Sequence, residues 1–284
     1  MATCVRDNSH RGTDTTVLVQ LAQLHSLIID MDGVLYHGNE PIRGAREFLK
    51  SLRQKGLTFI LVTNNSTLTT AQYVAKLARM GIQATAAEIL TSAEATATHL
   101  ARTAPPGARV YLIGEDGIRI ALQERGFVLS DDVDVPYVVV GFDRQLTYAK
   151  LVTAARAIHN GAQFIATNAD RTFPSEIGLV PGAGATLAAL EVATDTAPLV
   201  IGKPQPAIFE LALQRLHGGP NCTAVIGDGL YTDVLGGHGV GLMTILLMSG
   251  VTGPEQLLKA SPAPDRVYAD VAALYDAWRA APPA

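Results

Sequence analysis

Cysteine is scarce in this sequence, and long apolar runs are absent. Only Cys4 and Cys222 occur among 284 residues, which excludes a disulfide framework and indicates a reducing compartment. The longest apolar runs, such as the one at residues 243–248, are far too short to cross a bilayer. Residues 1–23 contain no uninterrupted apolar stretch of the kind found in signal peptides. Together these absences predict a cytoplasmic protein.

Charged residues are also few, and neither sign dominates. They make up 17% of the chain, and the formal net charge is -4. We therefore expect no partner that is held by bulk charge, neither a nucleic acid nor a membrane surface. Hydrophobic residues reach 48%, which is enough for a substantial core in one large domain or two smaller ones.

Short apolar runs alternate with helical patterns along most of the chain. Runs of this kind end at Asp30, Asn65, Lys203 and Asp228, and helical spacing follows, for example at residues 46–56. Apolar runs that are continuous rather than alternating are typical of strands covered on both faces. The pattern therefore predicts an α/β fold with a doubly wound parallel sheet.

A second, smaller α/β set interrupts this series. It begins at the Pro/Gly break of residues 104–108 and ends before residue 197, where the apolar runs of the core resume. The sequence thus predicts a core domain at 24–103 and 197–278 and an inserted cap domain at 104–196, about ninety residues long. Residues 1–23 and 279–284 are expected to be tails.

Polar side chains gather where the predicted core strands end. They are Asp30, Asp32, Thr63, Asn64, Asn65, Lys203, Asp228 and Asp233. In an open parallel sheet the carboxyl ends of the strands form the crevice where ligands bind, so these distant residues are expected to converge.

This set of side chains suits phosphate chemistry. Four carboxylates in one crevice repel each other unless a cation compensates, and oxygen ligands without a His or Cys cluster favour Mg²⁺ over zinc. One lysine and several neutral donors add a site for an anion rich in oxygen atoms, such as phosphate. Asp30 could attack phosphorus and Asp32 could transfer protons. Gly33 would permit the turn that brings both carboxylates close to one substrate.

The motifs DMDGV, T with NNS, GKP and GDGLYTD occur in this order. The chain resembles the haloacid dehalogenase (HAD) superfamily, in particular the NagD and 4-nitrophenylphosphatase type with an α/β cap, over residues 24–274. The resemblance implies an Mg²⁺-dependent phosphatase that forms an aspartyl phosphate, with Asp30 as nucleophile and Asp32 as acid/base. It implies Mg²⁺ ligation by Asp30, the Asp32 backbone carbonyl and Asp228, with Asp233 in support. It also implies phosphate binding by Thr63, Asn64 and Asn65, with Lys203 bridging nucleophile and phosphoryl oxygens.

Residues 166–185 are rich in turn formers and are expected to be a long functional loop. By resemblance this segment is the substrate-specificity loop, and Asn168 and Asp170 at its start are expected to bind substrate. The pyridoxal-phosphate branch of the family has a His before the Pro of this loop, whereas Phe173 precedes Pro174 here. A small sugar or polyol phosphate is therefore the favoured ester, and the resemblance is compatible with a homodimer.

Two positions depart from the family pattern, and they support one alternative function, a protein that binds phosphate esters without turnover. Gly229 stands where a larger polar residue is common, and Gly237 and His238 lie in the unusual stretch 236–239. The same site could serve a phosphotransferase or mutase, or a protein that binds phosphate esters without turnover. Haloacid dehalogenation is disfavoured, because that chemistry does not require the second acid, Asp32.

The turn after Ile113 lacks the spacing of a Walker phosphate-binding loop. It is predicted to join a strand to a helix.

Overall fold

The computed structural model describes residues 21, 23–175 and 178–280. Cys4 and almost all of the predicted N-terminal tail lie outside this part of the chain. The chain forms two compact units. Unit 1 comprises Met1–Val62, Val74–Ile89 and Phe209–Ala284, and unit 2 comprises Thr63–Tyr73 and Leu90–Ile208.

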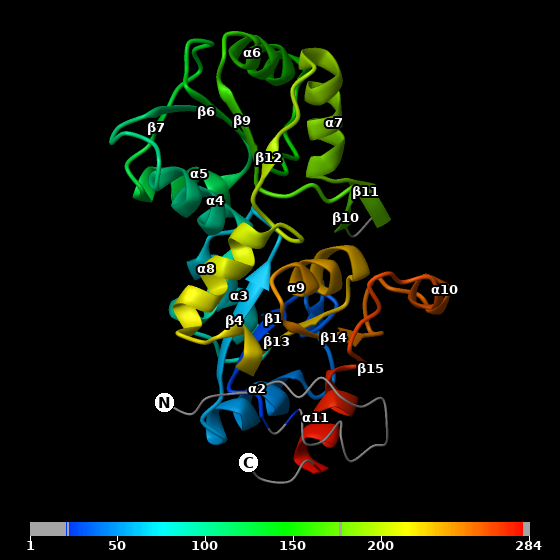
Figure 1. Cartoon of the computed structure of the whole chain (residues 1–284). Helices are drawn as coiled ribbons and strands as arrows, with labels where there is room; N and C mark the ends of the chain where they lie inside the picture. The colour runs from blue at the N-terminus through cyan, green and yellow to red at the C-terminus, as the bar shows by residue number, and fades with distance from the viewer. Residues whose placement is uncertain (1–20, 22, 176–177, 281–284) are drawn as a thin grey trace. The chain divides into compact units, whose positions relative to one another are not determined.

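A six-stranded sheet with the order β15-β14-β13-β1-β4-β5 is the centre of unit 1 (Figure 1). Its strands are β1 (Ser26–Asp30), β4 (Thr58–Thr63), β5 (Ile89–Thr91), β13 (Thr223–Gly227), β14 (Met243–Leu247) and β15 (Arg266–Tyr268). β1 pairs in parallel with both β13 and β4. Every residue of β13 and β14 is buried, which is why these strands are apolar on both faces.

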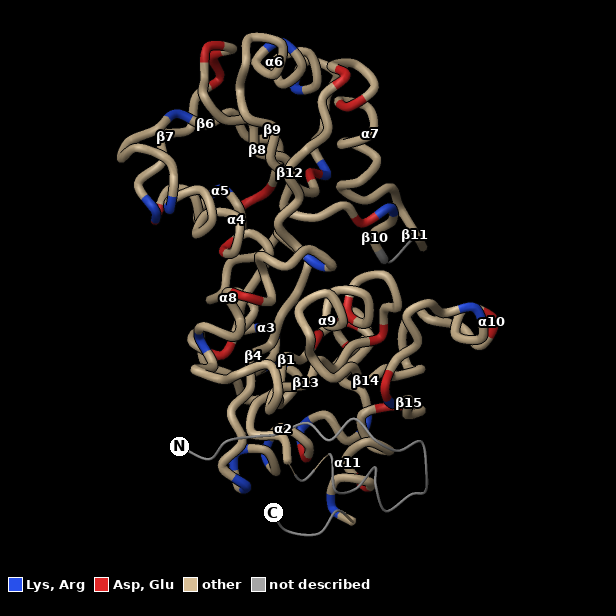
Figure 2. The backbone as a smooth tube through the Cα atoms, viewed as in Figure 1, with Lys and Arg blue, Asp and Glu red and all other residues tan. Residues whose placement is uncertain are grey.

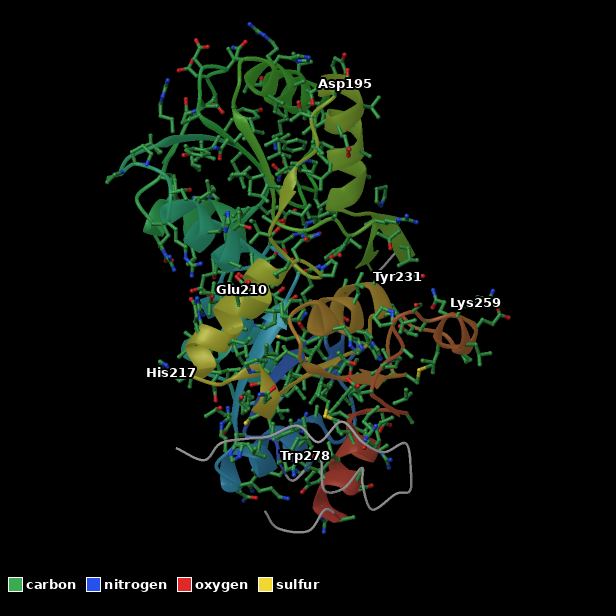
Figure 3. The ribbon with its side chains drawn as sticks, viewed as in Figure 1. Asp195, Glu210, His217, Tyr231, Lys259 and Trp278 are labelled. Carbon is green, nitrogen blue, oxygen red and sulfur yellow. The ribbon has the colours of Figure 1, made fainter. Side chains whose placement is uncertain are left out.

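Helices lie between or after the strands of this sheet along the chain. They are α2 (Ala45–Gln54), α3 (Thr70–Arg79), α8 (Pro206–Leu216), α9 (Leu235–Gly239), α10 (Pro254–Leu258) and α11 (Val271–Ala280), and the first turns of α3 and α8 belong to unit 2. α2 buries Ala45, Phe48, Leu49 and Leu52, at the spacing of one helix face. The Phe48 ring meets Trp278 of α11 edge to face at a centroid distance of 6.0 Å, and Figure 3 labels this tryptophan.

Unit 2 is built on a five-stranded sheet with the order β12-β9-β8-β6-β7. Its strands are β6 (Arg109–Ile113), β7 (Val128–Leu129), β8 (Tyr137–Val140), β9 (Gln163–Ala166) and β12 (Leu199–Val200). All four pairings between neighbouring strands of this sheet are parallel. The helices are α4 (Ser92–Ala101), α5 (Asp116–Glu124), α6 (Tyr148–His159) and α7 (Ala183–Thr194). A core that includes Val138, Phe164 and Leu190 lies between this sheet and the helices α6 and α7, which contact each other and are neighbours in Figure 1.

Parallel sheets with helices, one set in each unit, confirm the predicted α/β fold with a second, smaller α/β set. The predicted limits of the cap at 104 and 196 stay a prediction. The two compact units divide at other points, and Thr63–Tyr73 belongs to unit 2. Backbone hydrogen bonds explain this, because Gly117 N–H and Ile118 N–H of α5 donate to the carbonyls of Thr67 and Ser66.

The predicted loop at 166–185 contains more regular structure than its composition suggests. An antiparallel hairpin of β10 (Thr172–Ser175) and β11 (Gly178–Pro181) occupies its middle, and α7 begins at Ala183. Turn formers dominate this segment, so its short strands carry almost no apolar signal. A smaller hairpin, β2 (Tyr36–His37) with β3 (Glu40–Pro41), follows β1 in unit 1. Among the described residues, no helix is long and apolar enough to cross a membrane.

Candidate functional site

Three carboxylates meet at the carboxyl edge of the sheet in unit 1. Asp30 is the last residue of β1, and Asp228 follows β13, the neighbouring strand. Asp233 lies in a single π-helical turn, η3 (Leu230–Val234), directly before α9. One carboxylate oxygen from each of the three lies within 4.8 Å of the others. The predicted convergence of Asp30, Asp228 and Asp233 is therefore present in unit 1. Figure 2 shows acidic positions close to α9.

Backbone and hydroxyl donors hold Asp228 and Asp233 in place. Asp233 is 1% exposed, and its Oδ2 accepts hydrogen bonds from Gly229 N–H at 3.2 Å and Thr232 Oγ1 at 2.8 Å. Asp228 is 5% exposed, and its Oδ2 accepts from Val251 N–H at 2.8 Å. These donors orient the carboxylates before any ligand binds.

The donor set fits a hard divalent cation such as Mg²⁺. Asp30, Asp228 and Asp233 offer only carboxylate oxygens, the ligand type that Mg²⁺ prefers. Two of the three carboxylates are buried, and buried like charges at this separation repel strongly unless a cation lies among them. The Asp32 side chain is not part of this carboxylate group.

A tight turn places Asp32 two residues beyond Asp30. Leu35 N–H donates to Met31 O and Gly33 N–H donates to Tyr36 O, both at 2.8 Å. Gly33 has φ +78°, and a Cβ at this position would overlap the Asp228 carboxylate. A glycine is therefore needed here both for its backbone conformation and for the close approach of Asp228.

Burial raises the pKa of Asp32 above its ordinary value, although the charges of Lys76 and His37 and a hydrogen bond from the Gly33 N–H oppose the rise. A carboxyl group with a raised pKa is better able to donate a proton near neutral pH. Burial lowers the pKa of Lys76, whose Nζ lies 4.2 Å from the centroid of the Tyr36 ring. Lys76 could not be identified from the sequence, because one lysine on an amphipathic helix gives no signal.

Thr63, Asn64 and Asn65, which end and follow β4, form a hydrogen-bonded turn in unit 2. The Asn65 N–H donates to Thr63 Oγ1 at 3.1 Å, and Asn65 Oδ1 accepts from Thr67 N–H at 2.9 Å. Asn64 connects this turn to Lys203, since Lys203 N–H donates to Asn64 Oδ1 at 2.8 Å. Lys203 is 3% exposed. The structure thus brings the second and third sequence motifs together.

The two predicted cap residues, Asn168 and Asp170, belong to the same network. Asn168 is 4% exposed, its Nδ2 donates to Asn64 O at 2.8 Å, and its Oδ1 accepts from Asp170 N–H at 3.1 Å. Asp170 Oδ1 accepts from Asn64 Nδ2 at 3.0 Å. Ser92 Oγ also donates to Asn64 O, at 2.5 Å. Ser92 could not be identified from the sequence, because a serine in the first turn of a helix is common.

Local packing explains the two departures from the family pattern. A Cβ at Gly229 would overlap the Thr232 hydroxyl, which itself holds Asp233. Gly237 lets α9 approach β13 and β14, because its Cβ would lie 2.8 Å from Thr244 Cγ2. His238 Nε2 lies 3.0 Å from Ala263 O and 3.2 Å from Thr244 Oγ1. The turn after Ile113 joins β6 to α5, in agreement with its prediction.

The chain matches a family model described as haloacid dehalogenase-like hydrolase over residues 27–128 and a second, HAD-hydrolase-like model over residues 200–274. It is 43% identical over 244 residues to an acid sugar phosphatase of Staphylococcus saprophyticus, covering 86% of this chain and 94% of that protein.

Solved structures of similar proteins superpose over nearly the whole fold. A 4-nitrophenylphosphatase of Thermotoga maritima has a TM-score of 0.87 at 35% identity, with 91% and 99% of the two chains covered. NagD of E. coli has a TM-score of 0.82 at 35% identity, with 88% and 97% covered. A glycerol phosphate phosphatase of Mycobacterium tuberculosis, solved in complex with magnesium, has a TM-score of 0.84 at 32% identity, with 90% and 78% covered.

Proposed function

Since this chain belongs to the haloacid dehalogenase-like hydrolases and is a hydrolase of phosphoric monoesters, we propose that it is an Mg²⁺-dependent phosphatase of small sugar or polyol phosphates. The observation that carries this proposal is the meeting of Asp30, Asp228 and Asp233 at one edge of the unit 1 sheet, with Asp32 on the adjoining turn. The names of the acid sugar phosphatase and the glycerol phosphate phosphatase support the choice of ester.

Asp30 is the proposed nucleophile. One of its carboxylate oxygens forms a bond to phosphorus, and the bond from phosphorus to the ester oxygen breaks. Asp32 donates its proton to that oxygen, and the alcohol leaves. A water molecule then attacks the phosphorus of the aspartyl phosphate, Asp32 accepts a proton from it, and the bond from phosphorus to the Asp30 oxygen breaks. Inorganic phosphate leaves, Asp30 is again a carboxylate and Asp32 is again protonated.

Asp30, Asp228 and Asp233 would hold Mg²⁺, together with the Asp32 backbone carbonyl. When bound, the cation offsets the charge that would otherwise repel an anionic carboxylate from an anionic phosphoryl group. The magnesium complex of the M. tuberculosis relative supports this choice of metal. The side chains of Asp228 and Asp233 are pre-oriented by their hydrogen bonds, so binding of the metal need not order them.

The motifs assign the phosphate contacts to unit 2. Thr63, Asn64 and Asn65 are the proposed phosphate-binding turn, and Lys203 is the proposed cation that balances phosphoryl charge. Asn168 and Asp170 are the proposed substrate residues of the loop before β10. A cytoplasmic location and a homodimer remain predictions from the sequence.

Replacement of Asp30 tests this function. We expect Asp30→Asn to lower the hydrolysis of 4-nitrophenyl phosphate with Mg²⁺ by more than about 1,000-fold, because an amide oxygen is a poor nucleophile. Asp132→Asn is the matched control, since Asp132 is an exposed partner of Arg109, and it should retain full activity. Turnover by Asp30→Asn at the wild-type rate would reject Asp30 as the nucleophile.

A further inference from the structure

The Asn64 carboxamide makes three hydrogen bonds within unit 2. Its Oδ1 accepts from the Lys203 N–H at 2.8 Å. Its Nδ2 donates to Lys203 O at 3.0 Å and to Asp170 Oδ1 at 3.0 Å. The residue is 8% exposed, so this small group connects three separate segments of the chain away from solvent.

These contacts use every proton that the side chain can donate. A carboxamide has two N–H donors and one oxygen acceptor, and both donors are engaged. The Lys203 partners also fix its orientation, because the backbone N–H requires the oxygen and the backbone carbonyl requires the nitrogen. A side chain at Gly202 would intrude here, since its Cβ would lie 2.7 Å from Asn64 Oδ1.

The only remaining capacity of this side chain is a second lone pair on Oδ1. A lone pair repels phosphate oxygens, which need donors rather than acceptors. The side chain of Asn64 is therefore unsuited to bind phosphate as it stands, although its position in the motif suggests that role.

We propose that Asn64 is a positioning residue, whose carboxamide holds the Lys203 backbone and the Asp170 side chain in fixed relation and does not itself bind the phosphoryl group. This inference rests on the proposed function, because it explains how Lys203 is held in position for phosphate chemistry. Two hydrogen bonds to one residue's N–H and carbonyl fix the backbone from which the Lys203 side chain extends.

The same carboxamide reaches the segment that leads into the β10–β11 hairpin. Asp170 is the second residue that this carboxamide contacts. Its backbone carbonyl accepts a hydrogen bond from the Gly184 N–H at 2.9 Å, so Asp170 also contacts the start of α7. The Asn64 backbone carbonyl accepts from Asn168 Nδ2 and from Ser92 Oγ. Asn64 thus ties the phosphate-motif turn to both Lys203 and the predicted substrate loop.

Hydrogen exchange tests this role without relying on activity. In Asn64→Ala the Lys203 N–H loses its acceptor, so the segment 200–206 should take up on the order of one additional fast-exchanging deuterium. The N–H groups of Ile201, Gly202 and Gln205 donate to backbone carbonyls and serve as internal references that should not change. Asn160→Ala is the matched control, because it removes an exposed hydrogen bond from a carboxamide to Asp134.

Phosphate binding separates positioning from direct contact. Binding of inorganic phosphate is measured by calorimetry with Mg²⁺ present. Asn64→Ala should weaken binding about 10-fold in the wild-type background but less than 2-fold in a Lys203→Met background, because the effects of two coupled residues are not additive. Equal losses in both backgrounds, or an unchanged Lys203 amide in Asn64→Ala, would overturn the proposal.

A second pair of variants covers the case in which Asn64→Ala does not fold. Asp170→Ala removes one partner of the carboxamide, and Asp170→Asn restores an acceptor oxygen at the same place. We expect faster exchange of the Lys203 amide in Asp170→Ala and wild-type exchange in Asp170→Asn, and identical exchange in the two variants contradicts the role. An inactive wild-type protein would reject the proposed function, whereas the exchange result would still decide this inference.

Discussion

Gly33 shows how one residue's lack of a side chain shapes the acidic site. We expect Gly33→Ala to destabilise the protein and to weaken its activation by Mg²⁺, because the new Cβ would overlap the Asp228 carboxylate. Gly38→Ala is the matched control, with φ +57° and no atom within 4 Å of the new Cβ. Both variants should lose roughly 1–2 kcal/mol of unfolding free energy from the left-handed backbone.

The difference between these two glycine variants measures the contact with Asp228. Gly33→Ala should lose about 1–3 kcal/mol more than Gly38→Ala in urea unfolding, since overpacking in a tight site costs that much. A titration of activity against Mg²⁺ should be shifted only in Gly33→Ala. Equal stability loss and equal Mg²⁺ dependence of the two variants would show that Asp228 moves aside freely.

Glu115 and Arg144 give unit 2 a pH-dependent contribution to stability. Burial raises the pKa of Glu115, but hydrogen bonds from the Arg144 side chain and N–H outweigh it and hold the pKa below its ordinary value. Arg144 Nε lies 2.8 Å from Glu115 Oε1. Because the folded pKa is depressed, this contribution is complete above the unfolded pKa of about 4.5 and is lost as the pH falls through the folded value.

We therefore expect the unfolding free energy of wild type to exceed that of Glu115→Gln most at neutral pH, and the difference to shrink below pH 4.5. Urea unfolding at a series of pH values measures this difference. Arg144→Gln should remove the same pH-dependent part, because it removes the partner. A difference that grows as the pH falls would have the wrong sign for this ion pair.

Single residues of the acidic site could be predicted where a motif coincides with a strand end. Asp30 and Asp228 meet this condition, since each ends or follows a buried parallel strand. Lys76 and Val251 do not, because their effects on Asp32 and Asp228 depend on tertiary packing that no local pattern encodes. The sequence likewise does not show that both N–H donors of the Asn64 side chain are engaged, because this depends on where Lys203 and Asp170 lie in the fold.

At the scale of elements, α9 depends on a glycine for its packing. Gly237→Ala should destabilise the protein, because the new Cβ would lie 2.8 Å from Thr244 Cγ2 and 3.3 Å from Val225 Cβ. Gly239, in the same helix, has no atom within 4 Å of such a Cβ. Gly239→Ala should therefore be neutral or stabilising by up to about 1 kcal/mol, from helix propensity alone.

Thermal unfolding of the two alanine variants separates packing from propensity in this helix. The melting temperature should fall for Gly237→Ala and should stay level or rise for Gly239→Ala. If both rose together, the stretch 236–239 would be a loosely packed segment, and its departure from the family pattern would need another explanation.

The elements that could be predicted from the sequence are those in which buried residues follow a regular pattern. β1, β13 and β14 are apolar on both faces, and α2 buries one regular stripe, so each has a clear periodicity. The β10–β11 hairpin has no such signal, because glycines, prolines and exposed residues make up most of its sequence. Backbone hydrogen bonds from Gly182 N–H to Arg171 O and from Gly184 N–H to Asp170 O join the two ends of this segment, and no local sequence pattern encodes them.

At the scale of the whole molecule, each compact unit has a hydrophobic core of its own. The core of unit 2 includes Tyr111, Val140 and Leu187, and a separate cluster in unit 1 contains Leu230, Val234 and Leu246. The composition of the Pro/Gly breaks predicted that there are two sets of elements. It could not predict that Thr63–Tyr73 packs with unit 2, because that follows from hydrogen bonds to α5, which is distant in sequence.

Removal of the metal should act on the two units unequally. The carboxylates of Asp30, Asp228 and Asp233 all belong to unit 1. Without a cation, their mutual repulsion should therefore lower the stability of unit 1. Ligand at 100 times its dissociation constant stabilises the state that binds it by about 2.7 kcal/mol. We expect Mg²⁺ added to the EDTA-treated protein to restore activity and to slow hydrogen exchange in β1 and β13.

Exchange in β6, β8 and β9 of unit 2 should change much less, because local stability differs between parts of a structure that have separate cores. Asp233→Asn is the informative variant, since it removes one of the repelling charges. Without metal it should exchange more slowly than wild type in β13, and with Mg²⁺ it should gain less protection. Equal Mg²⁺ protection of both units in wild type would mean that they unfold together, and the metal would then stabilise the molecule as one cooperative body.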